Sequence, residues 1–329
     1  MLTATHRAAA LLVTCLFGLH APAQAQDAAA NFPNKAVRFI VSFAPGGGTD
    51  LLGRIAADHL SKALGQPFVV ENRPGAGGMI AARAVLAERP DGHTILVGGS
   101  TPMVFNPLVY SDLGYDRADL VAVTILGTYP MVIAGQHNVA KDMKELIESA
   151  KKKGGHMTYG HPGAAAWRAM MEAFNNALGI KMTHVPYKGG GPAATAFLGG
   201  ETDLIVSDMT SIVPLHKSGK ARVLAVTTKQ RNALFPEVPT VAESGIGLPD
   251  FEATAFAALG AHRQTPPAIL RKLQQGVAKA LADPAVRERL DALGIRPEGI
   301  SVEESQAMIQ AQIKRYGPIV EAAGMKEQK

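Results

Sequence analysis

The residues best suited to chemistry in this sequence are glycines in short turns that follow apolar, strand-like segments. Phe43 to Asp50 (Phe-Ala-Pro-Gly-Gly-Gly-Thr-Asp) leads from such a segment into a helical pattern. Unpaired amide N–H groups and the positive end of the helix dipole can face an anion there. Gly98 to Thr101, Gly160 to Gly163 and Gly189 to Gly191 repeat this arrangement. Because glycine is also needed merely to turn a chain, the prediction of an anion site depends on these turns converging on one crevice.

Other binding and catalytic motifs are missing from the sequence. Gly46 to Asp50 lacks the G-x-G-x-x-G spacing of dinucleotide sites, and no glycine loop ends in Gly-Lys-Ser or Gly-Lys-Thr. Neither G-x-S-x-G nor H-E-x-x-H occurs. The spacing of His156, His161 and His184 does not put two imidazoles on one helix face, so no metal site is expected. We therefore expect a binding protein with no catalytic residue and no cofactor. The alternative, an exported hydrolase, would be revealed by turnover of a solute.

Residues 1–25 have the pattern of a cleaved secretory signal. Arg7 supplies a positive charge, Ala8 to Leu19 form an uncharged run too short to span a bilayer, and Ala-Gln-Ala at 23–25 is a cleavage site. This predicts a periplasmic protein. Cys15, the only cysteine, leaves with the signal, so we expect neither disulfides nor a cysteine nucleophile.

Composition limits the class of protein further. With 329 residues and 47% hydrophobic content, the chain can bury a large core, and its length favours about two domains. The net charge is +5, but aromatic residues make up only 5% and no basic stripe carries interleaved aromatics, so nucleic-acid binding is not expected. The mild positive charge fits an anionic solute.

Strand-like and helix-like segments alternate along the chain, which predicts an α/β fold with a parallel sheet covered on both faces. One alternating unit covers residues 37–97 and a second covers 141–228, whereas 267–323 reads as helices with no strand between them. Helices without a sheet of their own must cover one made elsewhere. We therefore expect the chain to cross to a second lobe near 126–134, to return near 251–260, and to lay its last helices on the first lobe.

Two long motifs resemble the opening of Bug-type solute receptors, which serve tripartite tricarboxylate transporters. They are Phe43 to Asp50 and Val70 to Gly78 (Val-Glu-Asn-Arg-Pro-Gly-Ala-Gly-Gly). Similar segments follow in order over nearly all of the mature chain: Arg89–Thr94, Val185–Gly189, Gly199–Asp203, Ser218–Thr227 and Pro236–Thr240.

The resemblance implies a two-lobed periplasmic-binding-protein fold of the Venus-flytrap type II class, with two chain crossovers at the hinge. It also implies capture of a small carboxylate or related organic solute by lobe closure, a separate membrane permease as partner, and a monomer. We expect one lobe to comprise residues 32–128 plus 254–329 and the other 129–253. The alternative is an exported sensory protein that contacts a membrane signalling partner. It would have the same fold and the same lobe closure.

In this family two facing turns hold a ligand carboxylate through main-chain amides and ordered waters. The resemblance places Phe43 and the backbone donors of Ala44 and Gly47 in the first turn. The side chain of Asp50 would there repel a second carboxylate or attract an ammonium; alternatively it stabilises its own helix N-terminus. The turn after the third predicted strand, Gly98 to Thr101, adds Ser100 and Thr101 as candidate ligand contacts.

The second turn departs from the family pattern. Where relatives have Ser-x-Gly-x-Gly-Ser and then a His, this chain has His161, Pro162, Gly163, three alanines from Ala164, and Ala169 at the His position. His161 is a candidate replacement donor that would make binding depend on pH, since a free histidine has a pKa of about 6.5. The alternative interpretation is that His161 faces solvent in the turn.

Further candidates are an aromatic ring and two strand-end side chains. Trp167 either offers a ring face to an aromatic solute or packs under the second turn. With the alanines beside it, it predicts a less polar ligand than a short dicarboxylate. Tyr187 and Asp208 end strands of the second lobe, where each either lines the crevice or supports a neighbouring loop.

Overall fold

The computed structural model describes residues 29–163 and 165–327. The predicted signal segment with Cys15 and the candidate ligand residue Ala164 therefore lie outside the described residues. No helix in the described part of the chain is both long and apolar enough to cross a membrane.

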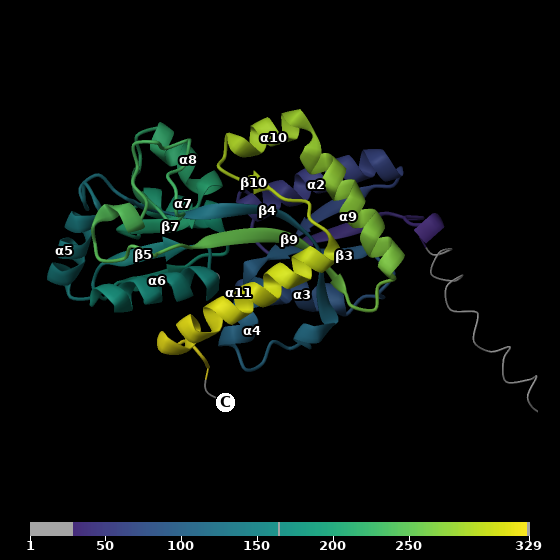
Figure 1. The fold of residues 1–329 in the computed structure, drawn as a ribbon, viewed down its shortest axis with the longest axis horizontal. Coiled ribbons are helices and arrows are strands. Elements are labelled where there is room, and N and C mark those ends of the chain that lie inside the picture. Colours follow the sequence, from purple (N-terminus) through teal and green to yellow (C-terminus); the bar gives the residue numbers. More distant parts are fainter. Residues whose placement is uncertain (1–28, 164, 328–329) are drawn as a thin grey trace, which may run out of the picture.

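Strands and helices alternate as the sequence predicts, and Figure 1 shows helices on both sides of a central sheet. The first part of the chain forms β1 (Val37–Val41), α2 (Gly48–Leu64), β2 (Phe68–Asn72), a 3-10 turn (Ala76–Gly78), α3 (Met79–Leu86), β3 (Thr94–Gly99), a π-helical turn (Thr101–Phe105), α4 (Asn106–Val109) and a 3-10 turn (Arg117–Asp119). The middle forms β4 (Leu120–Gly135), α5 (Met143–Lys153), β5 (Thr158–His161), α6 (Ala165–Leu178), β6 (Thr183–Pro186), α7 (Gly190–Leu198), β7 (Leu204–Asp208), α8 (Met209–Lys217), β8 (Arg222–Val226) and a 3-10 turn (Ala242–Ser244). The last part forms β9 (Thr254–His262), α9 (Pro267–Ala282), α10 (Pro284–Asp291), β10 (Arg296–Pro297) and α11 (Val302–Ala322).

The strands form one curled sheet in the order β2-β1-β3-β9-β4-β7-β5-β6, with β8 and β10 also paired to β4. β4 pairs with β9 over Leu120 to Pro130 and then with β7 over Met131 to Gly135. This strand therefore carries the chain from one half of the sheet to the other. We call the β2-β1-β3 side with its helices the first lobe and the β7-β5-β6 side the second. The predicted boundaries of these lobes stay a prediction.

The prediction of a parallel sheet is right at its two ends and wrong in its centre. β1 is parallel to both β2 and β3, and β5 is parallel to both β6 and β7. β9 is antiparallel to β3 and to β4. The reason is geometric, because a strand that leaves a lobe and a strand that returns to it must run in opposite directions. The short β10, which pairs with β4, is also a correction to the expectation of helices with no strand between them.

The last helices lie on the first lobe, as predicted. α9 packs against α2 and β4, and α11 packs along β4. The start of α11 is defined by a capping box, in which the Ser301 hydroxyl accepts from the Glu304 amide and the Glu304 carboxylate accepts from the Ser301 amide. Ser305, one turn into α11, accepts the buried amide of Ile125 in β4 at 3.1 Å. This bond ties the last helix to the sheet.

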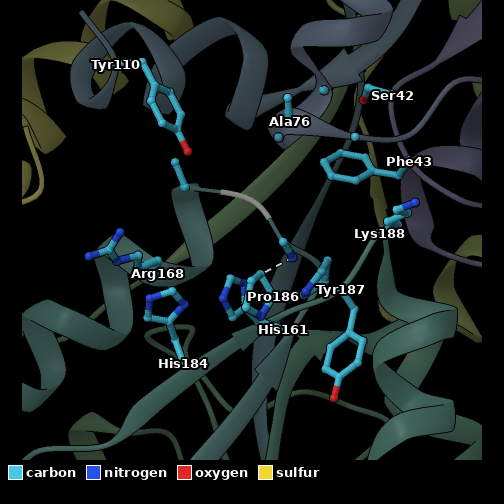
Figure 2. A pocket seen from close by; sticks show the side chains of 16 residues that line it. Ser42, Phe43, Ala76, Tyr110, His161, Arg168, His184, Pro186, Tyr187 and Lys188 are labelled. Carbon is cyan, nitrogen blue, oxygen red and sulfur yellow. Dashed lines mark hydrogen bonds between the residues drawn. The ribbon is translucent and has the colours of Figure 1, made fainter. Parts of the chain in front are cut away.

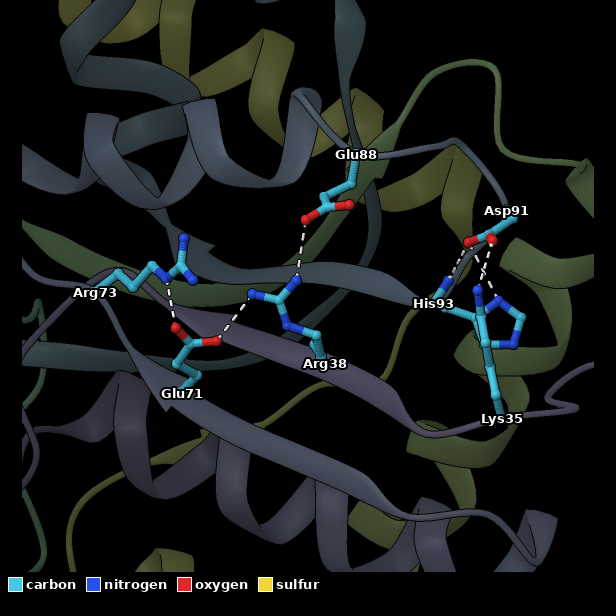
Figure 3. A network of polar contacts seen from close by, with 7 residues as sticks. All are labelled: Lys35, Arg38, Glu71, Arg73, Glu88, Asp91 and His93. Atoms are coloured by element: carbon cyan, nitrogen blue, oxygen red, sulfur yellow. Dashed lines mark hydrogen bonds and ion pairs between the residues drawn. The ribbon is translucent and has the colours of Figure 1, made fainter.

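Ion pairs at the edge of the first lobe hold β1 beside β2 (Figure 3). Arg38 contacts Glu71 and Glu88, each at 3.0 Å, and Arg73 contacts Glu71 at 2.6 Å. The hydrogen bond from Arg73 and then that from Arg38 lower the pKa of Glu71. Because these groups are more than one-third exposed, each pair adds little stability, and their effect is mainly on register.

Candidate ligand-binding site

A cavity of about 320 Å³ lies between the two lobes, a size typical of small-molecule sites. Figure 2 shows Ser42, Phe43 and Ala76 on one side of it and His161, His184 and Tyr187 on the other. Its wall is made by Ser42, Phe43, Gly75, Ala76, Gly77, Gly78 and Tyr110 of the first lobe and by His161, Pro162, Gly163, Ala165, Arg168, His184, Pro186, Tyr187 and Lys188 of the second. Both sets follow the carboxyl ends of strands or begin helices, where open α/β sheets place ligands.

On the first lobe, the wall includes the turn at residues 75–78, directly before α3. Gly75, Ala76, Gly77 and Gly78 have φ values of 131, 46, 58 and 88°, and Ala76 is the one non-glycine residue with positive φ in the described chain. Successive residues in such conformations form a nest of backbone N–H groups, which suits an anion. α3 begins directly after this turn without a side-chain cap, so the helix dipole adds to the same effect.

Ser42 lies directly beside this turn. A Cβ built on Gly78 would be 3.0 Å from Cβ of Ser42 and 3.4 Å from its Oγ. The hydroxyl is fully buried and has no hydrogen-bond partner among the described residues. A buried hydroxyl normally finds a partner, so this group is available to a ligand or a bound water.

On the second lobe, the wall centres on the turn after β5. The amide of Gly163 donates to Nδ1 of His161 at 3.2 Å, which puts the ring proton on Nε2. Gly163 has φ +73°, and a Cβ there would lie 2.1 Å from the carbonyl oxygen of Tyr187. Only glycine permits this close approach of the two turns.

Of the two sequence-based interpretations of His161, the solvent-facing one is wrong and the replacement donor stays a prediction. Its side chain is only 2% exposed, so it is not a solvent-facing histidine. Burial, then the charges of His184 and Arg168, lower its pKa to about 3. The ring is thus a neutral donor at physiological pH, and the expectation of an ordinary histidine pKa is wrong. Its Nε2 is buried without a partner in the described chain.

The charged side chains of the wall are all cations. Arg168 is on the first turn of α6, and its charge, after burial, also lowers the pKa of His184. The ring centres of His161 and His184 are 5.6 Å apart. Lys188 is exposed at the mouth of the cavity, and no acidic side chain is among the described residues of the wall. The charged side chains of the wall therefore favour an anionic ligand.

Four predicted residues line this cavity: Phe43, His161, Gly163 and Tyr187. The Tyr187 hydroxyl points away and donates to Glu201 at 3.1 Å, so its ring and backbone face the wall.

The other predicted residues of the turn from Phe43 to Asp50 are hydrogen-bonded to protein groups. The amide of Ala44 donates to the carbonyl oxygen of Lys188 at 3.0 Å, which joins the two lobes. The carboxylate of Asp50 accepts from the Gly46 amide at 3.3 Å, from Asn72 at 2.8 Å and from Arg54 at 3.0 Å. These bonds hold the carboxylate to protein donors, and the alternative that Asp50 stabilises its own helix N-terminus stays a prediction.

Asp208 is buried beneath the first turn and outside the cavity wall. It caps α8 by accepting from the Ser211 amide and also bonds the Gly48 amide across the lobes. A Cβ on Gly47 would lie 3.7 Å from its carboxylate. Burial raises its pKa against the lowering effect of these bonds. The contact of Asp208 with the Gly48 amide and the bond from Ala44 to Lys188 together join the two lobes.

Ser100, Thr101 and Trp167 are buried and, of the described residues, lie outside the cavity wall. Trp167 is 4% exposed and belongs to the apolar core, as expected for a ring that packs under the second turn. The prediction of a less polar ligand therefore loses the support of this ring and stays a prediction.

Sequence reasoning missed several wall residues. The turn at 75–78 was visible as a glycine motif before a helix, and Arg168 lies three residues after Ala165, on the same helix face. Ser42, Tyr110, His184 and Lys188 had no comparable signal, because the fold alone brings them to the cavity.

The comparisons with known proteins agree with this geometry. Residues 52–325 match the family model described as "Tripartite tricarboxylate transporter family receptor". The chain belongs to this family. A protein of Agrobacterium vitis, named for the TAR-I ttuE-ttuC' intergenic region, is 37% identical over 92% of this chain and 87% of its own. BugT of Bordetella pertussis is 32% identical over 94% of each chain.

Solved structures of similar sequence have the same two-lobed fold. An R. palustris protein with adipate has a TM-score of 0.85 and 32% identity, covering 89% of this chain and 98% of its own. MatC from Rhodopseudomonas palustris with bound malate has a TM-score of 0.82 and 32% identity, covering 88% and 100%. The periplasmic binding protein BugD has a TM-score of 0.84 and 30% identity, covering 90% and 100%. This family member is accordingly a solute-binding receptor and not an enzyme.

Proposed function

We propose that this receptor captures a small organic carboxylate between its lobes in the periplasm and delivers it to a membrane permease of the tripartite tricarboxylate type. The observation that carries the proposal is a cavity between two lobes whose charged side chains are cations and whose unpartnered polar atoms include the donors Ser42 Oγ and His161 Nε2. Solved relatives that hold adipate and malate support the ligand class. Cleavage of residues 1–25 and a monomeric state are part of the proposal.

In the proposed mechanism, the carboxylate docks on one lobe and closure adds contacts from the other. The hinge is β4 with β9, and the moving lobes are residues 32–128 plus 254–329 and 129–253. The bonds from Ala44 to Lys188 and from Gly48 to Asp208 hold the closed form. Closure shifts an existing equilibrium, and no covalent bond is made or broken.

Phe43, His161, Gly163 and Tyr187 are the proposed ligand contacts among the predicted residues, joined by Ser42 and the turn at 75–78. The carboxylate accepts from the Ser42 hydroxyl, from the amides of that turn and from Nε2 of His161. The Ser42 hydroxyl and Nε2 of His161 have no competing partner among the described residues, so each can contribute a charge-assisted hydrogen bond, whereas the Gly78 amide already donates to the Gly75 carbonyl oxygen.

A thermal-shift screen of organic acids tests the function. A ligand at 100 times its dissociation constant stabilises the protein by about 2.7 kcal/mol, which raises the melting temperature by roughly 5–10 °C. Ser42→Ala should weaken binding about 10- to 100-fold, because it removes one donor to a charged group. Ser218→Ala, in a loop of the second lobe outside the cavity, is the matched control.

The proposal fails if no carboxylate in the screen shifts the melting temperature, or if Ser42→Ala and Ser218→Ala bind the same acid equally well. Uptake by membranes that contain the permease, with and without the loaded receptor, tests delivery. A pull-down that retrieves a signalling protein and no permease would instead support the sensory alternative.

A further inference from the structure

We propose that the cavity selects carboxylic acids that carry no amino group, and that Arg168 and Lys188 are the residues that determine this preference. The inference rests on the proposed capture of a carboxylate by the same cavity and adds which carboxylates it accepts. It follows from three observations: the occupied acceptors of the wall, the pairing of the nearest acids and the two cations of the wall.

Five backbone carbonyl oxygens of the cavity wall already accept hydrogen bonds from protein groups. The occupied carbonyl oxygens are those of Phe43 (from Asn72, 2.9 Å), Gly75 (from the Gly78 amide, 2.9 Å), Gly77 (from Asn106, 3.0 Å), His161 (from the Tyr187 amide, 2.9 Å) and Lys188 (from the Ala44 amide, 3.0 Å). Nδ1 of His161 accepts from the Gly163 amide. An ammonium brings three donors into the cavity, and these acceptors would have to share their bonds with it.

The carboxylates nearest to the cavity are engaged elsewhere. Asp50 is held by Arg54 and Asn72 below the first turn. Glu201 accepts the Tyr187 hydroxyl, and Glu172, one turn after Arg168 on the same face of α6, pairs with Arg168 at 4.0 Å. None of them is part of the wall. A ligand ammonium would therefore lose its hydration and meet only carboxylates that already have protein partners, which is costly in a closed site.

The two cations of the wall would in addition repel a ligand ammonium. Arg168 and Lys188 both belong to the second lobe, and Figure 2 shows Arg168 beside His184. The amide nest at 75–78 and the start of α3 place further partial positive charge opposite them. A carboxylate meets favourable charge on both sides, while an α-ammonium meets only charge of its own sign.

Matched acid pairs that differ only in the α-ammonium test the preference. The pairs are glutarate and glutamate, adipate and 2-aminoadipate, and 3-phenylpropanoate and phenylalanine, measured by isothermal titration calorimetry at pH 7.5. In every pair that binds, the acid without the amino group should bind at least about 100-fold more tightly. The inference is overturned if an amino acid binds within threefold of its partner or more tightly, or if none of these acids binds.

Charge variants test the assignment to the two residues. In Arg168→Gln the acid without the amino group should bind about tenfold more weakly. The ratio of the two affinities in a pair should fall at least about threefold, because the ammonium loses a repulsive neighbour. Lys188→Gln, in an exposed turn, should change both quantities in the same direction but less. Arg271→Gln, on the exposed side of α9, is the matched control and should change neither. An unchanged ratio in both Arg168→Gln and Lys188→Gln would overturn the assignment.

The two proposals fail in different ways. If glutamate binds as tightly as glutarate, carboxylate capture stands and the preference is wrong. If none of the paired acids binds but another carboxylate shifts the melting temperature, capture again stands. If no carboxylate of any kind binds, the proposed function itself fails.

Discussion

Replacing His161 by glutamine should make the protein less sensitive to acid. The ring is 2% exposed and its pKa is lowered to about 3, mainly by burial. In the unfolded chain a histidine has a pKa of about 6.5. Between these values the unfolded state binds the proton and the folded state does not. The stability that this difference provides is therefore fully present above pH 6.5 and is lost as pH falls toward 3.

The magnitude follows from the same two values. At pH 5 the solution is 1.5 pH units below 6.5, and at about 1.36 kcal/mol per pH unit the folded state loses about 2 kcal/mol relative to neutral pH. His161→Gln removes this contribution, because glutamine does not titrate. It can still accept the Gly163 amide through its side-chain oxygen, so the turn keeps its hydrogen bond.

Urea denaturation at pH 7.5 and pH 5.0 measures the effect. The loss of unfolding free energy between the two pH values should be about 2 kcal/mol smaller in His161→Gln than in the unchanged protein. His156→Gln, at an exposed position before β5, is the control and should keep the full loss. The reasoning is refuted if His161→Gln and the unchanged protein lose the same free energy.

Two further substitutions test the site and its support. Gly163→Ala should weaken ligand binding at least about tenfold in calorimetry, because φ is +73° and the new methyl group would lie 2.1 Å from the Tyr187 carbonyl oxygen; unchanged affinity would show that the close approach of the turns is not needed. Ser305→Ala should lower the unfolding free energy by about 1–3 kcal/mol in urea denaturation, because it leaves the buried amide of Ile125 without its acceptor. A loss no larger than that of an exposed serine-to-alanine change would contradict this account.

The location of the site was only partly visible in the sequence. The four glycine turns pointed to the crevice, and the turns around Phe43 and His161 do form part of its wall. The turn that contains Ser100 and Thr101 is buried instead, because the strand before it runs in the middle of the sheet beside β9. Sequence shows that a turn follows a strand, but not which neighbour covers that strand.

The role of each polar group could not be read from its type. Asp50 and Asp208 are both acids near the first turn, yet both are held by protein donors. The Ser42 hydroxyl and Nε2 of His161 are common donor groups. They are available to a ligand because the fold buries them without a partner among the described residues. Hydrogen bonding depends on distances across the chain, and these are absent from local sequence.

By itself, the sequence determined the α/β class, the two crossovers near 126–134 and 251–260, and the receptor family, because hydrophobic periodicity, turn residues and ordered motifs are local properties of the chain. Tertiary structure alone decided that β4 and β9 run antiparallel through the centre. It also decided that Arg168 and Lys188 share a cavity with Ser42 and the amides of residues 75–78, and that His161 stays neutral. These features depend on groups from distant parts of the chain meeting out of water, where charge and burial act together.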